Sequence, residues 1–398
     1  MVNFPFSIVK MKALFLLEDG WSCECESFTG EGETFGELVF NTGLTGYQEI
    51  ITDPSYCGQI VMMTATMIGN YGIRSDEDES RRIHTEGFVV KEYAGETLDE
   101  RPVSQSARDR RFPGYTQRGP NSDVHYFHSS ISSSLARYLH DGGVLGVEGV
   151  DTRELTKYIR DRGAMRAGIS TLTLDRERFL KKVLRSPDIV GRDLVKEVTA
   201  EKPYLFSEGD RFRVAVLDCG VKISSLRELA RRGCRVEVFP ASISKKEILD
   251  SDPDGILVSN GPGDPAALPA VVELVANLLG EAPIFGICLG HQLIGQALGA
   301  RTFKLKFGHH GGNHPVREEK SKKVYITTQN HGFAVDMDSL DVNEIEFTHI
   351  NLNDYTLEGM RHTRLPLFSV QFHPEAGPGP HDTLSLFDEF LQMIALYR

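Results

Sequence analysis

Cysteine is scarce in this chain of 398 residues, which carries six cysteines spread over its length. No Cys-x-x-Cys pair and no cluster of cysteine with histidine offers four zinc ligands, so the spacing predicts neither a disulfide framework nor a metal site. Such sparse thiols favour the reducing environment of the cytoplasm, where we expect the protein to be located.

Long apolar runs and dense basic runs are also missing. No stretch approaches the roughly 18 to 20 uninterrupted apolar residues that a membrane span needs. The 44 basic residues are outnumbered by 56 acidic ones, giving a net charge of −12, whereas a nucleic-acid-binding face would be basic. The sequence therefore predicts a soluble protein with no membrane and no nucleic acid as partner.

The length suggests about two domains, and the pattern changes near residues 203–210. Residues 1–205 mix short β-like runs with turn residues and a few helical patterns, which is typical of an α+β domain. The β-like runs are 12–17, 37–41, 59–66 and 87–93, and the helical patterns are 130–139 and 153–160. A polar stretch at 95–128 is rich in arginine and reads as a long surface excursion.

Residues 210–398 alternate between apolar runs and helical patterns. This alternation predicts βαβ units, and so an α/β domain with a doubly wound, mainly parallel sheet. Expected strands are 213–217, 236–239, 255–258, 283–287, 323–328, 344–349 and 367–371, and expected helices are 224–232, 266–279, 291–298 and 383–395. Ligands of such sheets bind at the carboxyl ends of strands, so catalytic residues are expected in the loops there.

Cys288 follows one of these apolar runs directly. With Gly286 and Gly290 it forms a G-x-C-x-G sequence between a strand and a helix. Small flanking residues permit the sharp turn that presents a nucleophile above a sheet, and a helix start favours the thiolate. A buried structural cysteine flanked by packing glycines is the alternative, and this motif alone does not decide between them.

A base for such a thiolate stands after the last expected strand. Pro374 favours extended chain at His373, and residues two apart in extended chain face one side. His373 and Glu375 can therefore act as base and orienting carboxylate toward one place, which is the logic of covalent acyl transfer. A histidine near a strand end is often only a satisfied polar residue, but a second such element on the same sheet favours catalysis.

A third loop, SNGPGDP at 259–265, also follows an expected strand. Gly261 and Gly263 lie beside prolines, so the backbone can approach a substrate closely or supply an oxyanion hole. It lacks the Lys-Ser or Lys-Thr of a phosphate-binding loop.

SNGPGDP, GICLGHQ and FHPE in this order resemble a class I glutamine amidotransferase domain over roughly residues 210–398. The resemblance implies that Cys288 attacks the carboxamide of glutamine, that His373 shuttles the proton and that Glu375 orients His373. It further implies that N–H groups around Gly263 and Leu289 receive the oxyanion, and that a glutamyl thioester is hydrolysed to glutamate.

The N-terminal half is similar to the small subunit of carbamoyl-phosphate synthetase. The similarity rests on FNTGLTGYQEI at 40–50, TDPSY at 52–56, IGNYG at 68–72, VDTR at 150–153 and, in the other half, QNHGF at 329–333. In that family the residues matching a set drawn from both halves line the glutamine site. They are Ser55, Gly261, Gly263, Leu289, Gln292, Asn330, Gly332 and Phe333.

The resemblance implies a division of labour. This chain would hydrolyse L-glutamine without a cofactor or metal of its own, and a separate large subunit would use ammonia, bicarbonate, ATP and magnesium to make carbamoyl phosphate. That product would serve pyrimidine and arginine biosynthesis. Two alternatives stay open. The first is an amidotransferase of another synthase, which the FNTGLTGYQEI stretch disfavours. The second is a non-catalytic regulatory scaffold, which the complete set of Cys288, His373 and Glu375 disfavours.

Overall fold

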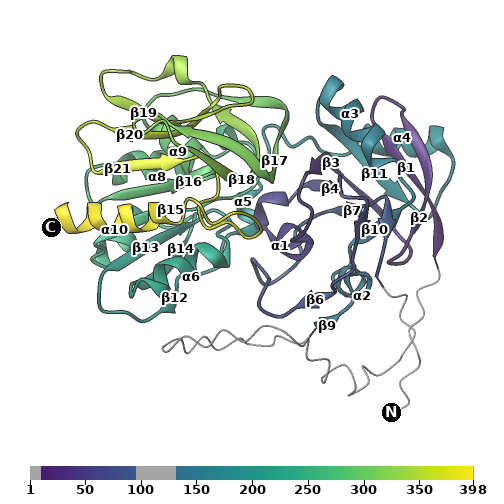
Figure 1. The fold of residues 1–398 in the computed structure, drawn as a ribbon, viewed down its shortest axis with the longest axis horizontal. Helices are drawn as coiled ribbons and strands as arrows, with labels where there is room; N and C mark the ends of the chain where they lie inside the picture. Colours follow the sequence, from purple (N-terminus) through teal and green to yellow (C-terminus); the bar gives the residue numbers. More distant parts are fainter. Residues whose placement is uncertain (1–9, 96–130, 398) are drawn as a thin grey trace, which may run out of the picture.

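The computed structural model describes residues 10–95 and 131–397. Two large sheets organise these residues, a closed barrel and a ten-stranded sheet, and they lie side by side in Figure 1. Residues 1–9 and nearly all of the polar stretch predicted at 95–128 lie outside the described residues. Within the described part, no helix is long and apolar enough to cross a membrane.

The barrel is built from the first part of the chain. Its strand order is β1-β11-β3-β4-β7-β10-β2, with both parallel and antiparallel pairs. The strands are β1 (Met11–Leu17), β2 (Ser22–Ser27), β3 (Glu33–Asn41), β4 (Gln59–Met63), β7 (Gly87–Val89), β10 (Leu145–Glu148) and β11 (Met165–Ser170). The period of two is visible in β1, where Phe15 enters the barrel core and Leu14 and Leu16 pack under α4 (Arg176–Val183).

Short elements surround the barrel. They are α1 (Tyr47–Thr52), the 3-10 helix η1 (Pro54–Tyr56), β5 (Met67–Ile68), β6 (Ile73–Arg74), β8 (Glu92–Tyr93), β9 (Ile131–Ser133), α2 (Leu135–Asp141), α3 (Thr152–Arg162) and α5 (Val195–Val198). The turn η1 is fixed locally, because Asp53 caps it by accepting the Ser55 N–H at 2.9 Å and Pro54 occupies its first position. This turn points Ser55 toward the second sheet.

The ten-stranded sheet has the order β12-β14-β13-β15-β16-β21-β20-β19-β17-β18. Its strands are β12 (Tyr204–Ser207), β13 (Arg213–Asp218), β14 (Arg235–Pro240), β15 (Gly255–Val258), β16 (Ile284–Ile287), β17 (Thr302–Glu318), β18 (Val324–Val335), β19 (Ile345–Asn351), β20 (Leu357–His362) and β21 (Leu367–Val370). The run β14-β13-β15-β16-β21 is parallel. The strands from β20 to β18 extend it in antiparallel fashion.

Helices cover both faces of the parallel run, as its sequence predicts. In β15 the side chains of Ile256 and Val258 join one core with α8 (Pro269–Leu278) and α9 (Leu289–Ala297), while Leu257 joins the opposite core with α6 (Ile223–Arg231) and α10 (Ser385–Tyr397). Two 3-10 turns, η3 (Pro265–Ala267) and η4 (Met337–Ser339), and α7 (Lys245–Asp250) complete this part. The predicted α/β fold class is therefore confirmed, with a larger antiparallel extension than the sequence indicated.

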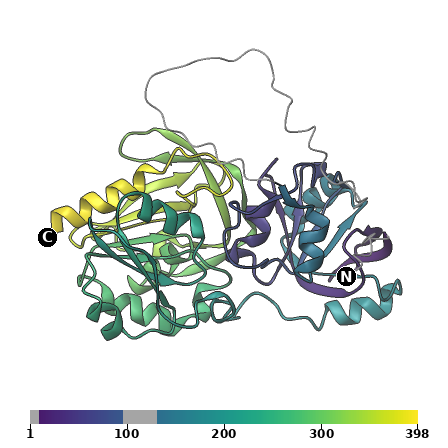
Figure 2. The same ribbon diagram turned by 90° about the horizontal axis from the view of Figure 1, so that it is seen from below.

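The limits of the two predicted domains, 1–205 and 210–398, stay a prediction. The second sheet begins with β12 at Tyr204, just inside the first of these ranges. The two parts contact each other directly: the Thr42 N–H donates to the His310 carbonyl at 3.2 Å, and the Ile223 N–H donates to the Glu79 carbonyl at 2.9 Å. Figure 2 shows the same arrangement from below, with the barrel and the second sheet in contact.

Candidate active site

Cys288 stands at the sharp turn between β16 and α9. Its backbone has a φ of 53°, a left-handed value that is rare outside glycine, and its side chain is buried. A Cβ at Gly286 would lie 2.4 Å from Ile294 Cδ1, and one at Gly290 would lie 2.1 Å from the Val258 carbonyl oxygen. The two glycines are thus required by close approach of chain to chain, and the turn presents Cys288 at the carboxyl end of the parallel strands.

His373 lies just beyond the neighbouring strand β21. Its backbone N–H donates to the Thr328 carbonyl at 2.9 Å, which fixes the extended conformation predicted from Pro374. His373 Nδ1 and Glu375 Oε1 are 2.7 Å apart, and both side chains are buried. The carboxylate therefore holds the ring through Nδ1, which leaves Nε2 available to Cys288.

The charges around His373 favour its protonated form. Burial opposes the charged ring, but the negative charges of the Glu375 carboxylate and the Cys288 thiolate raise the pKa of His373 to about 10. Burial likewise opposes the Glu375 carboxylate, yet Lys222 and His373 lower the pKa of Glu375 to about 2. The site thus holds a carboxylate and an imidazole that can keep a proton at neutral pH.

Lys222 is a member of this group that sequence reasoning missed. Its Nζ is buried 3.3 Å from Glu375 Oε1 and donates to the Ala376 carbonyl. Burial alone would lower the pKa of Lys222, but Glu375 and Glu79 raise it. Lys222 does follow a predicted strand, but nothing in one sequence distinguishes a lysine that folds inward from one that faces solvent.

Residues from both parts of the chain line one cavity beside Cys288. Seven of the eight residues that the resemblance assigns to glutamine are among its lining residues, and the eighth, Leu289, is the first residue of α9 next to it. The lining consists of Ser55, Gln59, Ile189, Gly261, Gly263, Cys288, Gln292, Asn330, His331, Gly332 and Phe333. Gln59, Ile189 and His331 were not predicted as site residues, although His331 lies in the QNHGF motif at 329–333.

Hydrogen bonds between the two parts hold this lining in place. Asn260 Nδ2 donates to Ser55 Oγ at 3.0 Å, and Asn330 Nδ2 donates to Asp53 Oδ2 at 3.0 Å. Within the second part, Gln292 Nε2 donates to the Phe333 carbonyl at 2.7 Å. Asp53 and Asn260 were also missed from the sequence, because their importance rests on contacts between segments about 200 residues or more apart.

The glycines of the 259–265 loop permit close packing. Gly263 has a φ of 85°, and a Cβ at Gly261 would lie 2.0 Å from the Cys219 carbonyl oxygen. At Gly332 a Cβ would meet nothing within 4 Å, so this backbone faces open space beside the cavity. The backbone is thereby exposed to whatever occupies the cavity.

A cysteine at a strand-to-helix elbow, with a histidine and carboxylate pair after the adjacent parallel strand, is the arrangement expected of a triad amidotransferase. The sequence also matches the family described as "Glutamine amidotransferase class-I" over residues 215–393. The N-terminal part matches "Carbamoyl-phosphate synthase small chain, CPSase domain" over residues 15–111 and 120–169.

Curated relatives agree over nearly the whole chain. A "Carbamoyl phosphate synthase small chain" of Syntrophotalea carbinolica is 46% identical over 98% of this chain and 99% of its own length. The protein of the same name from Methanopyrus kandleri is 48% identical over 96% of this chain and 99% of its own length. The chain therefore belongs to the carbamoyl phosphate synthase small chain family.

Proposed function

We propose that this chain hydrolyses L-glutamine and supplies the ammonia to a carbamoyl phosphate synthase large chain. The single observation that carries the proposal is the buried His373 and Glu375 pair, 2.7 Å apart, beside a cysteine at a strand-to-helix elbow. Family membership supports it independently, through both the amidotransferase match and the small-chain match.

In this mechanism Cys288 is the nucleophile and His373 carries the proton. The thiolate attacks the carboxamide carbon, and the oxyanion that forms is received by backbone N–H groups at Gly263 and at Leu289, where the first turn of α9 leaves N–H groups without helical partners. His373 gives its proton to the nitrogen as the C–N bond breaks, and ammonia leaves.

The second half of the cycle regenerates the cysteine. His373, now neutral, takes a proton from water while the water oxygen attacks the glutamyl thioester. Glutamate leaves and the proton returns to the Cys288 and His373 pair. Throughout, Glu375 keeps Nδ1 of His373 occupied, so that only Nε2 exchanges protons.

We propose that the predicted glutamine residues of this lining bind the substrate. Ser55, Gln292 and Asn330 offer side-chain donors and acceptors, whereas Gly261, Gly332 and Phe333 offer backbone groups. No metal or cofactor is needed for this step, since the nucleophile, base and orienting carboxylate are all side chains of this chain. ATP and magnesium would be used by the large chain.

Glutamate release from L-glutamine tests this proposal directly. The purified chain should release glutamate slowly alone and much faster with a carbamoyl phosphate synthase large chain present. Cys288→Ser should abolish the release in both states while leaving ammonia-dependent carbamoyl phosphate synthesis by the complex intact. Cys234→Ser, which changes another buried thiol outside the cavity lining, is the matched control and should keep the activity.

The other outcomes separate the alternatives. A stable complex with no glutamate release in either state would indicate the non-catalytic scaffold. Release that responds to the synthase of another pathway and not to this large chain would indicate a different amidotransferase.

A further inference from the structure

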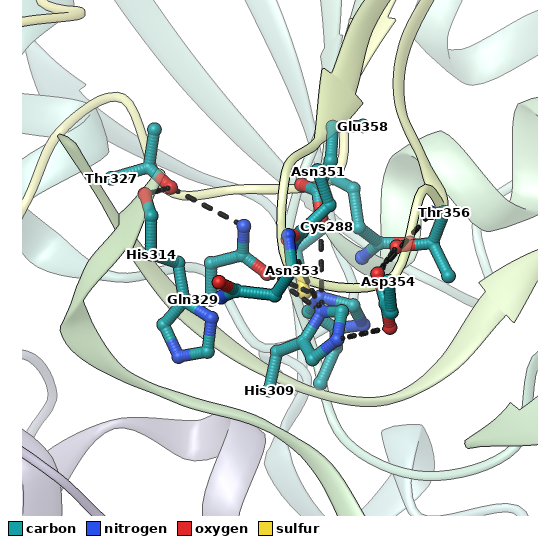
Figure 3. Close-up of polar contacts among 12 residues, drawn as sticks. Cys288, His309, His314, Thr327, Gln329, Asn351, Asn353, Asp354, Thr356 and Glu358 are labelled. Atoms are coloured by element: carbon teal, nitrogen blue, oxygen red, sulfur yellow. Dashed lines mark hydrogen bonds and ion pairs between the residues drawn. The ribbon is translucent and has the colours of Figure 1, made fainter. Parts of the chain in front are cut away.

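A second buried polar cluster lies in the antiparallel extension of the sheet. It joins His309 of β17, His331 of β18 and Glu358 of β20, and one ligand atom of each lies within 4.8 Å of the others. Gln329 of β18 lies between the two histidines, and its Oε1 is 3.0 Å from His309 Nδ1. Figure 3 shows His309, Gln329 and Asp354 pointing toward one another.

Every ring nitrogen of the two histidines faces an oxygen. His309 Nδ1 faces Gln329 Oε1 at 3.0 Å, and His309 Nε2 faces Asp354 Oδ2 at 2.8 Å. His331 Nε2 faces the same Gln329 oxygen at 2.8 Å, and His331 Nδ1 faces the Phe333 carbonyl at 2.7 Å. A neutral imidazole carries only one N–H, so two neutral rings leave two of these four contacts without a proton.

Turning the Gln329 amide would give both rings a donor, but at the cost of a hydrogen bond elsewhere. Its Nε2 donates to Thr327 Oγ1 at 3.2 Å, and the Thr327 hydroxyl already donates to the His314 carbonyl at 2.9 Å. Turning the amide would place its oxygen against Thr327 Oγ1, and the Thr327 hydroxyl would have to leave the His314 carbonyl in order to donate to it. The orientation that keeps both of these hydrogen bonds directs Gln329 Oε1 at both rings.

Additional protons on the two histidine rings would supply only some of the missing hydrogen-bond donors. If His309 alone carries two protons, one nitrogen of His331 still meets an oxygen without a proton between them. If both rings are charged, two cations with ring centroids 4.8 Å apart share a buried space. The two oxygens that face His331 belong to a carbonyl and an amide, so neither supplies a balancing negative charge. A buried charge without a charged partner is costly.

We propose that a divalent transition-metal cation occupies this cluster, bound by His309 Nδ1, His331 Nε2, Glu358 and Gln329 Oε1. The far nitrogen of each ring then donates to an oxygen, His309 to the Asp354 carboxylate and His331 to the Phe333 carbonyl, as metal-bound histidines commonly do. Both charges of the cation are balanced by Glu358 and Asp354.

An independent observation points to the same ligand. Glu358 is fully buried, and its Oε2 has no hydrogen-bond partner in the described part of the chain, while Oε1 accepts from Asn351 Nδ2 at 2.9 Å. The same Asn351 amide lies 3.5 Å from His309 Nδ1, a weak contact that leaves this nitrogen its lone pair. Glu358 Oε1 also lies 3.6 Å from His309 Nδ1. A buried carboxylate oxygen without a donor, such as Oε2, indicates a water or an ion, and a cation bound by the two histidines would satisfy it.

The donor set favours zinc. Two imidazole nitrogens with two oxygens suit a four-coordinate Zn²⁺, whose ligands stand about 2.0 to 2.2 Å away. Tetrahedral ligands at these distances lie about 3.3 to 3.6 Å apart. Atoms that are now up to 4.8 Å apart must therefore move more than about 1 Å closer on binding. His331 lines the cavity beside Cys288 between Asn330 and Gly332, so the bound ion would fix this wall of the cavity.

Metal content of the untagged full chain tests this proposal. We expect about one zinc per chain after dialysis, and reconstitution of the chelator-treated protein with Co²⁺ should give visible ligand-field bands of a tetrahedral site with no sulfur-to-cobalt charge-transfer band. The latter distinguishes the cluster from ligation by Cys288.

Asp354→Asn is the decisive variant, because Asp354 contacts His309 only through Nε2 and its other partners are the nearby Thr356 N–H and hydroxyl. Its side chain is 39% exposed, so we expect the variant to fold. Zn²⁺ affinity, measured by titration calorimetry, should fall about 10- to 100-fold. Asp341→Asn is the matched control, since Asp341 accepts a nearby backbone N–H as Asp354 does, and should leave the affinity unchanged. Glu358→Gln should lose tight binding altogether.

Three results would overturn the proposal. They are a wild-type chain that neither retains zinc nor binds it in titration, a sulfur-to-cobalt band, and equal affinities in the wild type and Asp354→Asn. Any of these results would indicate that the cluster is a hydrogen-bond network of protonated side chains and binds no metal ion. None of these readouts depends on glutaminase activity, so the proposed function is judged separately.

Discussion

At the scale of single residues, the candidate site is a chain of buried charges. Glu79, Lys222, Glu375 and His373 follow one another from the barrel side to the cysteine, and three of them are in direct contact. Buried charges persist only when each has its partner. The residues behind the triad should therefore matter for stability as well as for catalysis.

Lys222→Met should destabilise the protein strongly. The change leaves Glu375 and Glu79 buried without their cation, a loss of about 3 to 5 kcal/mol in the free energy of unfolding. Urea unfolding followed by circular dichroism measures this. Lys246→Met, which breaks an exposed pair with Asp250, is the control and should be neutral.

His373→Asn should lower the glutaminase rate by at least about 10²-fold, the usual contribution of a general base. Steady-state glutamate release measures it. His362→Asn provides the control, because His362 is also buried in the second sheet but lies outside the cavity lining. A near-normal rate in His373→Asn would remove this residue from the mechanism.

Glu375 should make stability fall at low pH. Its pKa is lowered from 4.5 to about 2 in the folded chain, so its stabilisation is complete above about pH 4.5 and is lost as the pH falls toward 2. Between these pH values the free energy of unfolding of the wild type should fall more steeply than that of Glu375→Gln. Urea unfolding at pH 5, 4 and 3 compares them, and parallel curves would contradict the lowered pKa.

At the scale of elements, the site depends on how tightly α9 approaches the sheet. Gly290→Ala would press its Cβ to 2.1 Å from the Val258 carbonyl oxygen, so the helix must move. Destabilisation of about 1 to 3 kcal/mol is expected from such overpacking, together with loss of glutaminase activity. Gly312→Ala meets its nearest atom at 3.4 Å and should change the melting temperature much less.

The elements that carry the triad were predictable from the sequence because each is local. A strand, a turn with small residues and a helix follow one another at Cys288, and Pro374 constrains His373 directly. Strands β17 and β20 and the closure of the barrel were not predicted, since long polar strands such as Thr302–Glu318 lack apolar alternation and closure depends on distant pairings. The cluster of His309, His331 and Glu358 was not predicted from the sequence for the same reason, because its residues come from three strands.

At the scale of the whole molecule, the cavity exists only where the two parts meet. Ser55 reaches it from the barrel side and accepts from Asn260 across the contact. The resemblance was the only sequence signal for Ser55, because a serine after proline otherwise looks like an ordinary turn residue. A binding site shared by two parts is also suited to respond to a partner chain.

Ser55→Ala should weaken glutamine binding with little effect on folding, since Asn260 keeps its bond to the Gly220 carbonyl at 2.9 Å. Loss of one hydrogen bond worth about 0.5 to 1.5 kcal/mol corresponds to a rise in KM of about 2- to 10-fold. Ser225→Ala, a buried serine on α6 outside the lining, should leave KM unchanged. A wild-type KM in Ser55→Ala would exclude this residue from the substrate site.

The most direct test of the account is to capture the glutamyl thioester. The chain is mixed with L-glutamine, quenched in acid within the turnover time, digested and analysed by mass spectrometry. A glutamyl adduct on the Cys288 peptide, absent in Cys288→Ser and accumulating when hydrolysis is slowed, is the predicted result. Steady glutamate release with no adduct on Cys288, or with the adduct on another residue, would contradict the assignment of Cys288 as the nucleophile.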